Sequence, residues 1–325
     1  MARPSKWIKD VSPSQRVAEV ARTSLTNRIG TVADFLPKAA ESADDDIEYV
    51  HQLRVATRRS MAAIQTFQSL LPKRRSHKLR KMLRRLRRAA GEARDLDVLH
   101  ERLRIHAKVS EVRGMKKVLA KVVDRREQAQ WPLLEIHRKW KKKNYDQRVQ
   151  QLLARVRWRS KSPEPTFDLI AASALQPSVN DLFDAASADL ENISALHQMR
   201  ICAKQVRYTM ELLAGAFPSE FREELYPMLT EVQDKLGAIN DSATAEQIVQ
   251  AWAAEAKSRE AAAELNRMAA DEREQLGSAS LDFRRWWTPE RASEFRQQFA
   301  PYLVPRSPQA TDADEDEHPP RAVAL

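Results

Sequence analysis

The stretch YVHQLRVATRRSMAAIQTFQSLLP, residues 49–72, decides the fold, because it returns as ALHQMRICAKQVRYTMELLAGAFP at residues 195–218. One offset of 146 residues aligns the two copies without a gap and extends beyond them, as far as Asp95 and Asp241. Self-similarity over such a length is typical of a chain built from related structural units. Two copies predict a pair of pseudo-symmetric helical halves and not an open-ended solenoid.

Each copy has the pattern of an amphipathic helix with a row of cations on its polar face. Spacings of three, four and seven residues fall on one face of an α-helix, and apolar residues fill the opposite face. The two rows comprise His51, Arg54, Arg58 and the neighbouring Arg59 in the first copy, and His197, Arg200, Lys204 and Arg207 in the second. Cations that only keep a surface soluble need no common spacing with a histidine. The rows therefore indicate an anionic partner.

The segment KRRSHKLRKMLRRLRRAAGEA, residues 73–93, is the most basic part of the chain. Its apolar residues form a helical stripe, and the short connection predicts that it lies antiparallel to the first repeat helix. A second basic row is then expected on another face, where its members fall within roughly 80° of one another. This row comprises Arg74, Lys78, Lys81, Arg85 and Arg88. A solvated helix face is the alternative, which the mutual repulsion of so many positive charges disfavours.

The composition favours an all-α protein. Only 6 of 325 residues are glycine and 42% are hydrophobic, so helix is favoured over sheet and the core can fill one or two domains. The single cysteine, Cys202, excludes a disulfide framework. The chain begins without an apolar signal region and has no long apolar run, so we expect a cytoplasmic protein without a membrane span.

The charge is distributed unevenly. The net charge is +10, but residues 1–160 carry a balance of +22 and residues 161–325 a balance of −12. Such asymmetry indicates a polyanionic partner for the basic part of the chain.

The sequence predicts an N-terminal arm over residues 1–12, a helical domain over 13–300 and a disordered acidic tail over 301–325. The hinge SKSPEP at 160–165 is expected to separate half one, residues 13–160, from half two, residues 166–300. Further interruptions are expected at a kink or close approach near Gly91, between residues 130 and 131, and between residues 175 and 177.

The paired motifs VHQLRVATRR and LHQMRICAKQVR, with the stretch AGEARDLDVL, resemble the CHAD family, the conserved histidine α-helical domain. The resemblance covers roughly residues 13–300. It implies two related four-helix bundles facing one another across a positively charged cleft or pore, and binding of inorganic polyphosphate, in the cytoplasm or at polyphosphate granules.

The family motif transfers to this chain residue by residue. Its histidine corresponds to His51 and His197, its arginine to Arg54 and Arg200, and its next basic position to Arg58 and Lys204. A further basic position is Arg207 in the second copy but Met61 in the first. The third helix of half two has also lost most of its cations, so half one is expected to hold more of the ligand.

A polyphosphate binder needs dense cations and hydrogen-bond donors. Arginine supplies planar pairs of donors, lysine a point charge, and histidine a stronger donor when it is protonated. We expect a binding module without a cofactor and not an enzyme, since nucleotide loops and metal-binding motifs are missing from the sequence. General polyanion or RNA binding is the alternative, disfavoured because the rows contain no tryptophan for base stacking. An accessory domain of a polyphosphate-acting enzyme is a third.

Some questions stay open at this point. The sequence leaves undecided the oligomeric state and whether Arg94 or the lysine cluster at 139–143 joins the site.

Overall fold

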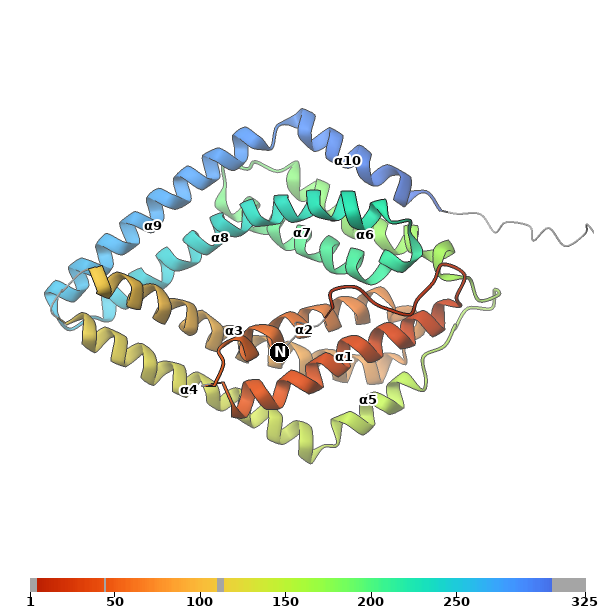
Figure 1. The fold of residues 1–325 in the computed structure, drawn as a ribbon, viewed down its shortest axis with the longest axis horizontal. Helices are drawn as coiled ribbons and strands as arrows, with labels where there is room; N and C mark the ends of the chain where they lie inside the picture. Colours follow the sequence, from red (N-terminus) through yellow and green to blue (C-terminus); the bar gives the residue numbers. More distant parts are fainter. Residues whose placement is uncertain (1–4, 44, 110–113, 306–325) are drawn as a thin grey trace, which may run out of the picture.

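The structure is a computed structural model that describes residues 5–43, 45–109 and 114–305. Half one contains α1 (Val17–Glu41), α2 (Glu48–Thr66), α3 (Lys73–Val109), α4 (Met115–Lys142) and α5 (Tyr145–Leu153). Half two contains α6 (Phe167–Ala186), α7 (Ile193–Leu213), α8 (Tyr226–Glu255), α9 (Arg259–Trp286) and α10 (Pro289–Leu303). No strand forms within these described ranges, so the predicted all-α class is confirmed. Figure 1 shows half one below half two.

The repeat helices α2 and α7 follow from the amphipathic pattern. Their apolar faces are buried, with Leu53 and Ile64 on α2 and Met199 and Val206 on α7. α7 is capped at its start by Asn192, whose side chain accepts a hydrogen bond of 2.8 Å from the Ser194 amide. A 3₁₀ turn continues each helix, at Gln68–Leu70 and Ala214–Ala216, before the proline that ends each repeat.

Two of the expected interruptions are wrong, and the kink expected as one alternative near Gly91 is not present. α3 runs without a break through Gly91, α4 through Pro132 and α6 through Pro177. A side chain close to each proline is buried in the core, Leu133 beside Pro132 and Val179 near Pro177. Burial of these side chains outweighs the one hydrogen bond that an interior proline removes. A Cβ at Gly91 would lie 4.0 Å from Nη1 of Arg54, an ordinary van der Waals contact, so the glycine faces Arg54.

Two hydrophobic cores hold the chain together. The larger one fills both halves. The smaller one joins the far ends of α3 and α4 to those of α8 and α9, with Leu103 and Val122 packed near Val249 and Leu265. Figure 1 shows these four helix ends meeting at one tip of the molecule. The two halves therefore meet at this tip and again where α2 packs against α7.

The N-terminal arm packs against half two. The Trp7 ring meets the Tyr226 ring edge-on, with centroids 4.7 Å apart. A Cβ on Gly215 would lie 2.6 Å from Val11, so only glycine lets the arm approach this closely. Arg28 donates to the carbonyl oxygens of Ser5 and Lys6. Residues 5–12 are thus part of the contact between the halves.

The C-terminal boundary differs slightly from the expected one. α10 ends at Leu303, so three residues assigned to the tail are helical. The rest of the expected disordered tail, from residue 306 onward, lies outside the described residues. The pseudo-twofold relation of the halves stays a prediction.

Candidate anion-binding site

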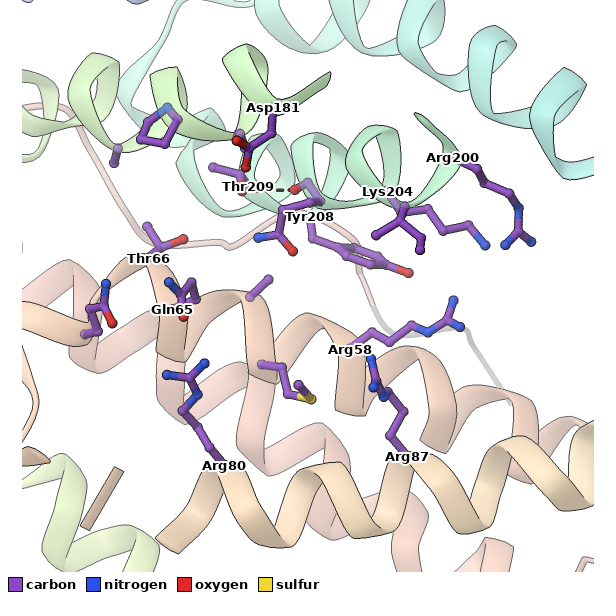
Figure 2. Close-up of a pocket in the computed structure, with 18 of the residues that line it drawn as sticks. Arg58, Gln65, Thr66, Arg80, Arg87, Asp181, Arg200, Lys204, Tyr208 and Thr209 are labelled. Carbon is purple, nitrogen blue, oxygen red and sulfur yellow. Dashed lines mark hydrogen bonds between the residues drawn. The ribbon is translucent and has the colours of Figure 1, made fainter. Parts of the chain in front are cut away.

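Both histidine helices line two adjoining cavities between the halves. The volumes of these cavities are about 890 Å³ and about 470 Å³. Four residues line both of them, namely Arg58, His197, Arg200 and Lys204. We call the two cavities together the central cavity. Figure 2 shows Arg58 and Lys204 pointing into the larger part from α2 and α7, with Arg87 from α3 beside Arg58.

The walls of the central cavity are rich in cations. They come from three helices: His51, Arg54 and Arg58 of α2, Arg80, Arg87, Arg94 and Arg102 of α3, and His197, Arg200 and Lys204 of α7. Half one supplies most of the arginines. Within the described part of the chain, the acids on these walls are Asp95, Asp181 and Asp241.

The two copies form the same arginine–aspartate pair at this cavity. Arg54 Nη1 lies 3.0 Å from Asp95 Oδ1, and Arg200 Nη2 lies 3.5 Å from Asp241 Oδ1. Both arginines and both aspartates correspond at the 146-residue offset. The Asp95 and Asp241 side chains are 49% and 65% exposed, so solvent screens each pair. We infer that the aspartates mainly orient the guanidinium groups.

The histidines lie at the surface of the cavity and not in the core. His197 is exposed, and its Nδ1 lies 2.7 Å from Oδ1 of Asn240. Since an amide oxygen only accepts, this contact requires a proton on Nδ1 and leaves Nε2 for the cavity. His51 is half-buried and lines the smaller part of the cavity.

The electrostatics of the cavity disfavour further positive charge. Burial, together with nearby Arg200 and Arg58, lowers the pKa of Lys204 to about 7. Burial likewise lowers the pKa of Arg87, helped by Arg58 and Arg54. Each added cation raises the cost of charging the next, so an anion in the cavity would stabilise all of them.

Arg59 and Arg207 do not belong to this site, which corrects the sequence prediction. Arg59 donates two hydrogen bonds, of 2.7 and 3.0 Å, to the carboxylate of Glu211. Arg207 Nε lies 4.0 Å from the same carboxylate, which also accepts a hydrogen bond from the Tyr226 hydroxyl. The Glu211 side chain is only 1% exposed. Both arginines are therefore engaged in a buried ion-pair cluster between α2 and α7.

The structure does not bring the basic row predicted on α3 to the central cavity. Lys81, Arg85 and Arg88 are exposed and line neither part of the central cavity, and Arg74 and Lys78 line a separate cavity beside α5. The row that does face the cavity lies roughly 120° further round the helix. It includes Arg80, Arg87 and Arg94.

The row that lines the cavity also has regular helical spacing, so spacing alone does not distinguish it from the predicted row. Arg80, Arg87 and Arg94 are spaced by seven residues and share the helix face of Gly91, the residue that approaches Arg54. Arg94, left open above, thus lines the site, and Arg102 was missed. The lysine cluster pairs with acids elsewhere: Lys139 lies 3.0 Å from Glu135, and Lys141 lies 3.7 Å from Glu41.

Fold and site together define an all-α protein of two helical halves around a cation-lined cavity. The family model of the CHAD domain matches residues 29–250, and the chain belongs to this family. The family prediction is thereby confirmed. A search of curated proteins finds no match.

Two solved structures share the fold. One is the CHAD domain of the plant Ricinus communis, with 19% identity and a TM-score of 0.64, covering 92% of this chain and 96% of the other. The second is PptA from Streptomyces chartreusis, with 17% identity and a TM-score of 0.60, covering 84% of this chain and 99% of the other. At these identities the likeness concerns the fold alone.

Across the described ranges, no helix combines the length and apolarity that a membrane span requires.

Proposed function

We propose that the protein binds inorganic polyphosphate in the central cavity, as a binding module and not as an enzyme. The observation that carries this proposal is that residues of both histidine rows and the α3 arginines converge on the central cavity. Membership of the CHAD family agrees with it.

The cations are arranged along a path and not in one cluster. Arg80, Arg87, Arg94 and Arg102 extend over about 33 Å of α3, at about 1.5 Å per residue. Across the cavity, Arg200 and Lys204 face them from α7. An extended polyanion can contact such a series of donors, whereas a single phosphate can contact only a few.

The guanidinium groups on the walls suit an oxygen-rich ligand. Arg58, Arg87 and Arg200 each carry several N–H donors and no acceptor. Phosphate oxygens accept hydrogen bonds from such groups, which can donate them in pairs.

We expect polyphosphate to bind at least tenfold more tightly than nucleic acid. In the described part of the chain, Tyr208 is the one Phe, Tyr or Trp that lines the central cavity, so bases find almost no surface for stacking. The measurement titrates the protein with long polyphosphate, single-stranded RNA and duplex DNA at matched phosphate concentration and about 0.15 M salt. Equal affinity for all three would contradict selective binding and indicate general polyanion binding.

His197→Ala is expected to weaken polyphosphate binding about tenfold. One hydrogen bond to a charged group contributes about 1.5 kcal/mol. Because His197 is exposed, the free energy of unfolding should change by about 0.5 kcal/mol or less. Titration calorimetry and urea unfolding test this, and a large loss of stability with unchanged affinity would assign His197 a structural role.

Polyphosphate binding is expected to take up a proton at Lys204 near pH 8. The pKa of about 7 leaves this lysine mostly neutral there, and an anion beside it favours the charged form. Affinity should therefore fall as pH rises from about 7 to 9. In the free protein, stability depends on pH in the opposite direction to affinity. The fold disfavours the charged lysine, so the contribution of Lys204 to the free energy of unfolding increases as pH rises above about 7.

Calorimetry in two buffers with different ionisation enthalpies measures this proton uptake. Lys204→Arg is the control variant, because arginine stays charged across the range. The variant should bind with less proton uptake and a flatter dependence of affinity on pH. Equal proton uptake by the variant and the original protein would show that another group titrates.

A further inference from the structure

A third cavity lies beside the start of α3, where this helix meets α5. Its volume is about 710 Å³, and it shares no lining residue with the central cavity. Five cations line it: Arg74, Arg75, Lys78, Arg148 and Arg155. No aspartate or glutamate of the described chain lines it. We call it the outer cavity, and Figure 1 shows α5 along the lower edge of half one.

The outer cavity is held in shape by packing. Leu79 of α3 and Val149 and Leu152 of α5 form its floor and belong to the larger core. Above this floor, Arg75 Nη1 donates a hydrogen bond of 2.9 Å to Oε1 of Gln151, which joins the two helices. The core therefore fixes the positions from which the cations extend.

The cations of the outer cavity are not neutralised by the protein. Across the described residues, none of the five forms an ion pair with an acid. Other exposed cations do so, for example Lys121 and Arg125 with Glu255. The start of α3 adds the partial positive charge of a helix N-terminus. Mutual repulsion makes this arrangement unfavourable unless an anion occupies it.

We propose that the outer cavity is a second anion-binding site, which takes a compact ligand carrying several phosphate groups. Five cations on two helices surpass what one phosphate group can contact, and the cavity is short compared with the path along α3. The ring of Tyr145, with the Arg148 guanidinium 5.6 Å from its centre, forms one wall. The site does not depend on what the central cavity binds.

Three matched variants of the full chain test this proposal. The outer variant is Arg74→Gln/Lys78→Gln/Arg148→Gln, and the central variant is Arg58→Gln/Arg87→Gln/Lys204→Gln. The control variant carries three substitutions on exposed α3 residues that line none of the three cavities: Lys81→Gln/Arg85→Gln/Arg88→Gln. Each variant removes two arginines and one lysine, so the formal net charge changes equally, and measurement at pH 6 keeps Lys204 charged for the comparison.

Calorimetry with tripolyphosphate at about 0.15 M salt provides the main readout. The original protein and the control variant should bind at two sites. The outer variant should lose one site, with affinity there reduced at least tenfold, and keep the other within about twofold. An outer variant that behaves like the control overturns the proposal, as does a central variant that loses both sites.

Hydrogen exchange locates the second site. In the central variant, tripolyphosphate should still slow amide exchange in α5, residues 145–153. Unchanged exchange there overturns the proposal. If exchange in α5 slows but no variant shows binding at the central cavity, the outer site is supported and the proposed function is contradicted instead. Repeating the titration with inositol hexakisphosphate then shows whether the outer cavity binds phosphates arranged around a ring more tightly than phosphates in a linear chain.

Discussion

Replacing Arg58, Arg87 and Lys204 together by glutamine is expected to weaken polyphosphate binding about a thousandfold. The three side chains converge on the central cavity from α2, α3 and α7 (Figure 2). One charged hydrogen bond lost from each costs about 1.5 kcal/mol, and about 4.5 kcal/mol in total corresponds to roughly three powers of ten in affinity. The measurement is titration with long polyphosphate at about 0.15 M salt.

The control for this result is the variant Lys81→Gln/Arg85→Gln/Arg88→Gln. It removes the same residue types, two arginines and one lysine, from α3 positions outside the central cavity, and we expect its affinity to fall by less than tenfold. Equal losses in the two variants would show that affinity follows net charge and would contradict a defined site. The central variant should keep its melting temperature, because it removes charges that repel one another and leaves the core unchanged.

Replacing Glu211 by alanine is expected to destabilise the protein by about 3–5 kcal/mol. Its carboxylate accepts two hydrogen bonds from Arg59 and one of 2.9 Å from the Tyr226 hydroxyl. Without it, Arg59 and Arg207 stay largely buried with no anion, which is the costly way to break a buried ion pair. Burial and the charge of Arg59 already lower the pKa of nearby Arg28 to about 10. Urea unfolding followed by circular dichroism measures the change.

Gln65→Ala is the matched control for this prediction. Gln65 occupies the position in the first copy that corresponds to Glu211, but it lines the central cavity. Its replacement should change the free energy of unfolding by about 0.5 kcal/mol. Arg59→Ala provides the opposing test. If it lowers polyphosphate affinity at equal folded fraction and leaves stability unchanged, Arg59 returns to the ligand site.

The Glu211 cluster also explains the difference between the two repeat copies. Arg207 pairs with Glu211 in the buried cluster, whereas Met61 at the matching position of the first copy lines the central cavity. At three pairs of positions related by the 146-residue offset, the second copy has a member of the buried Glu211 cluster and the first copy has a residue that lines the central cavity: Arg207 and Met61, Glu211 and Gln65, Tyr226 and Arg80. The N-terminal arm packs against this cluster, where Trp7 meets Tyr226.

Helical periodicity and the repeat were enough to predict the helical class and six of the residues that line the central cavity. Helical periodicity is a local property, so the apolar face of α2 and the row from His51 to Arg58 follow from spacing alone. The repeat then assigned His197, Arg200 and Lys204 to equivalent positions. Local signals failed at Pro132 and Pro177, where burial of neighbouring side chains decided that the helix continues.

The cations of α3 that face the cavity could be identified only from the packing of the helices. α3 carries basic residues on both sides of its apolar stripe, and nothing in its own spacing says which side meets half two. Packing of α2 against α7 selected the face of Arg80, Arg87 and Arg94. The same packing brought Glu211 to Arg59, 152 positions apart in the chain. No local sequence pattern identifies a partner so far away in the chain, because the folded backbone decides which charged side chains meet.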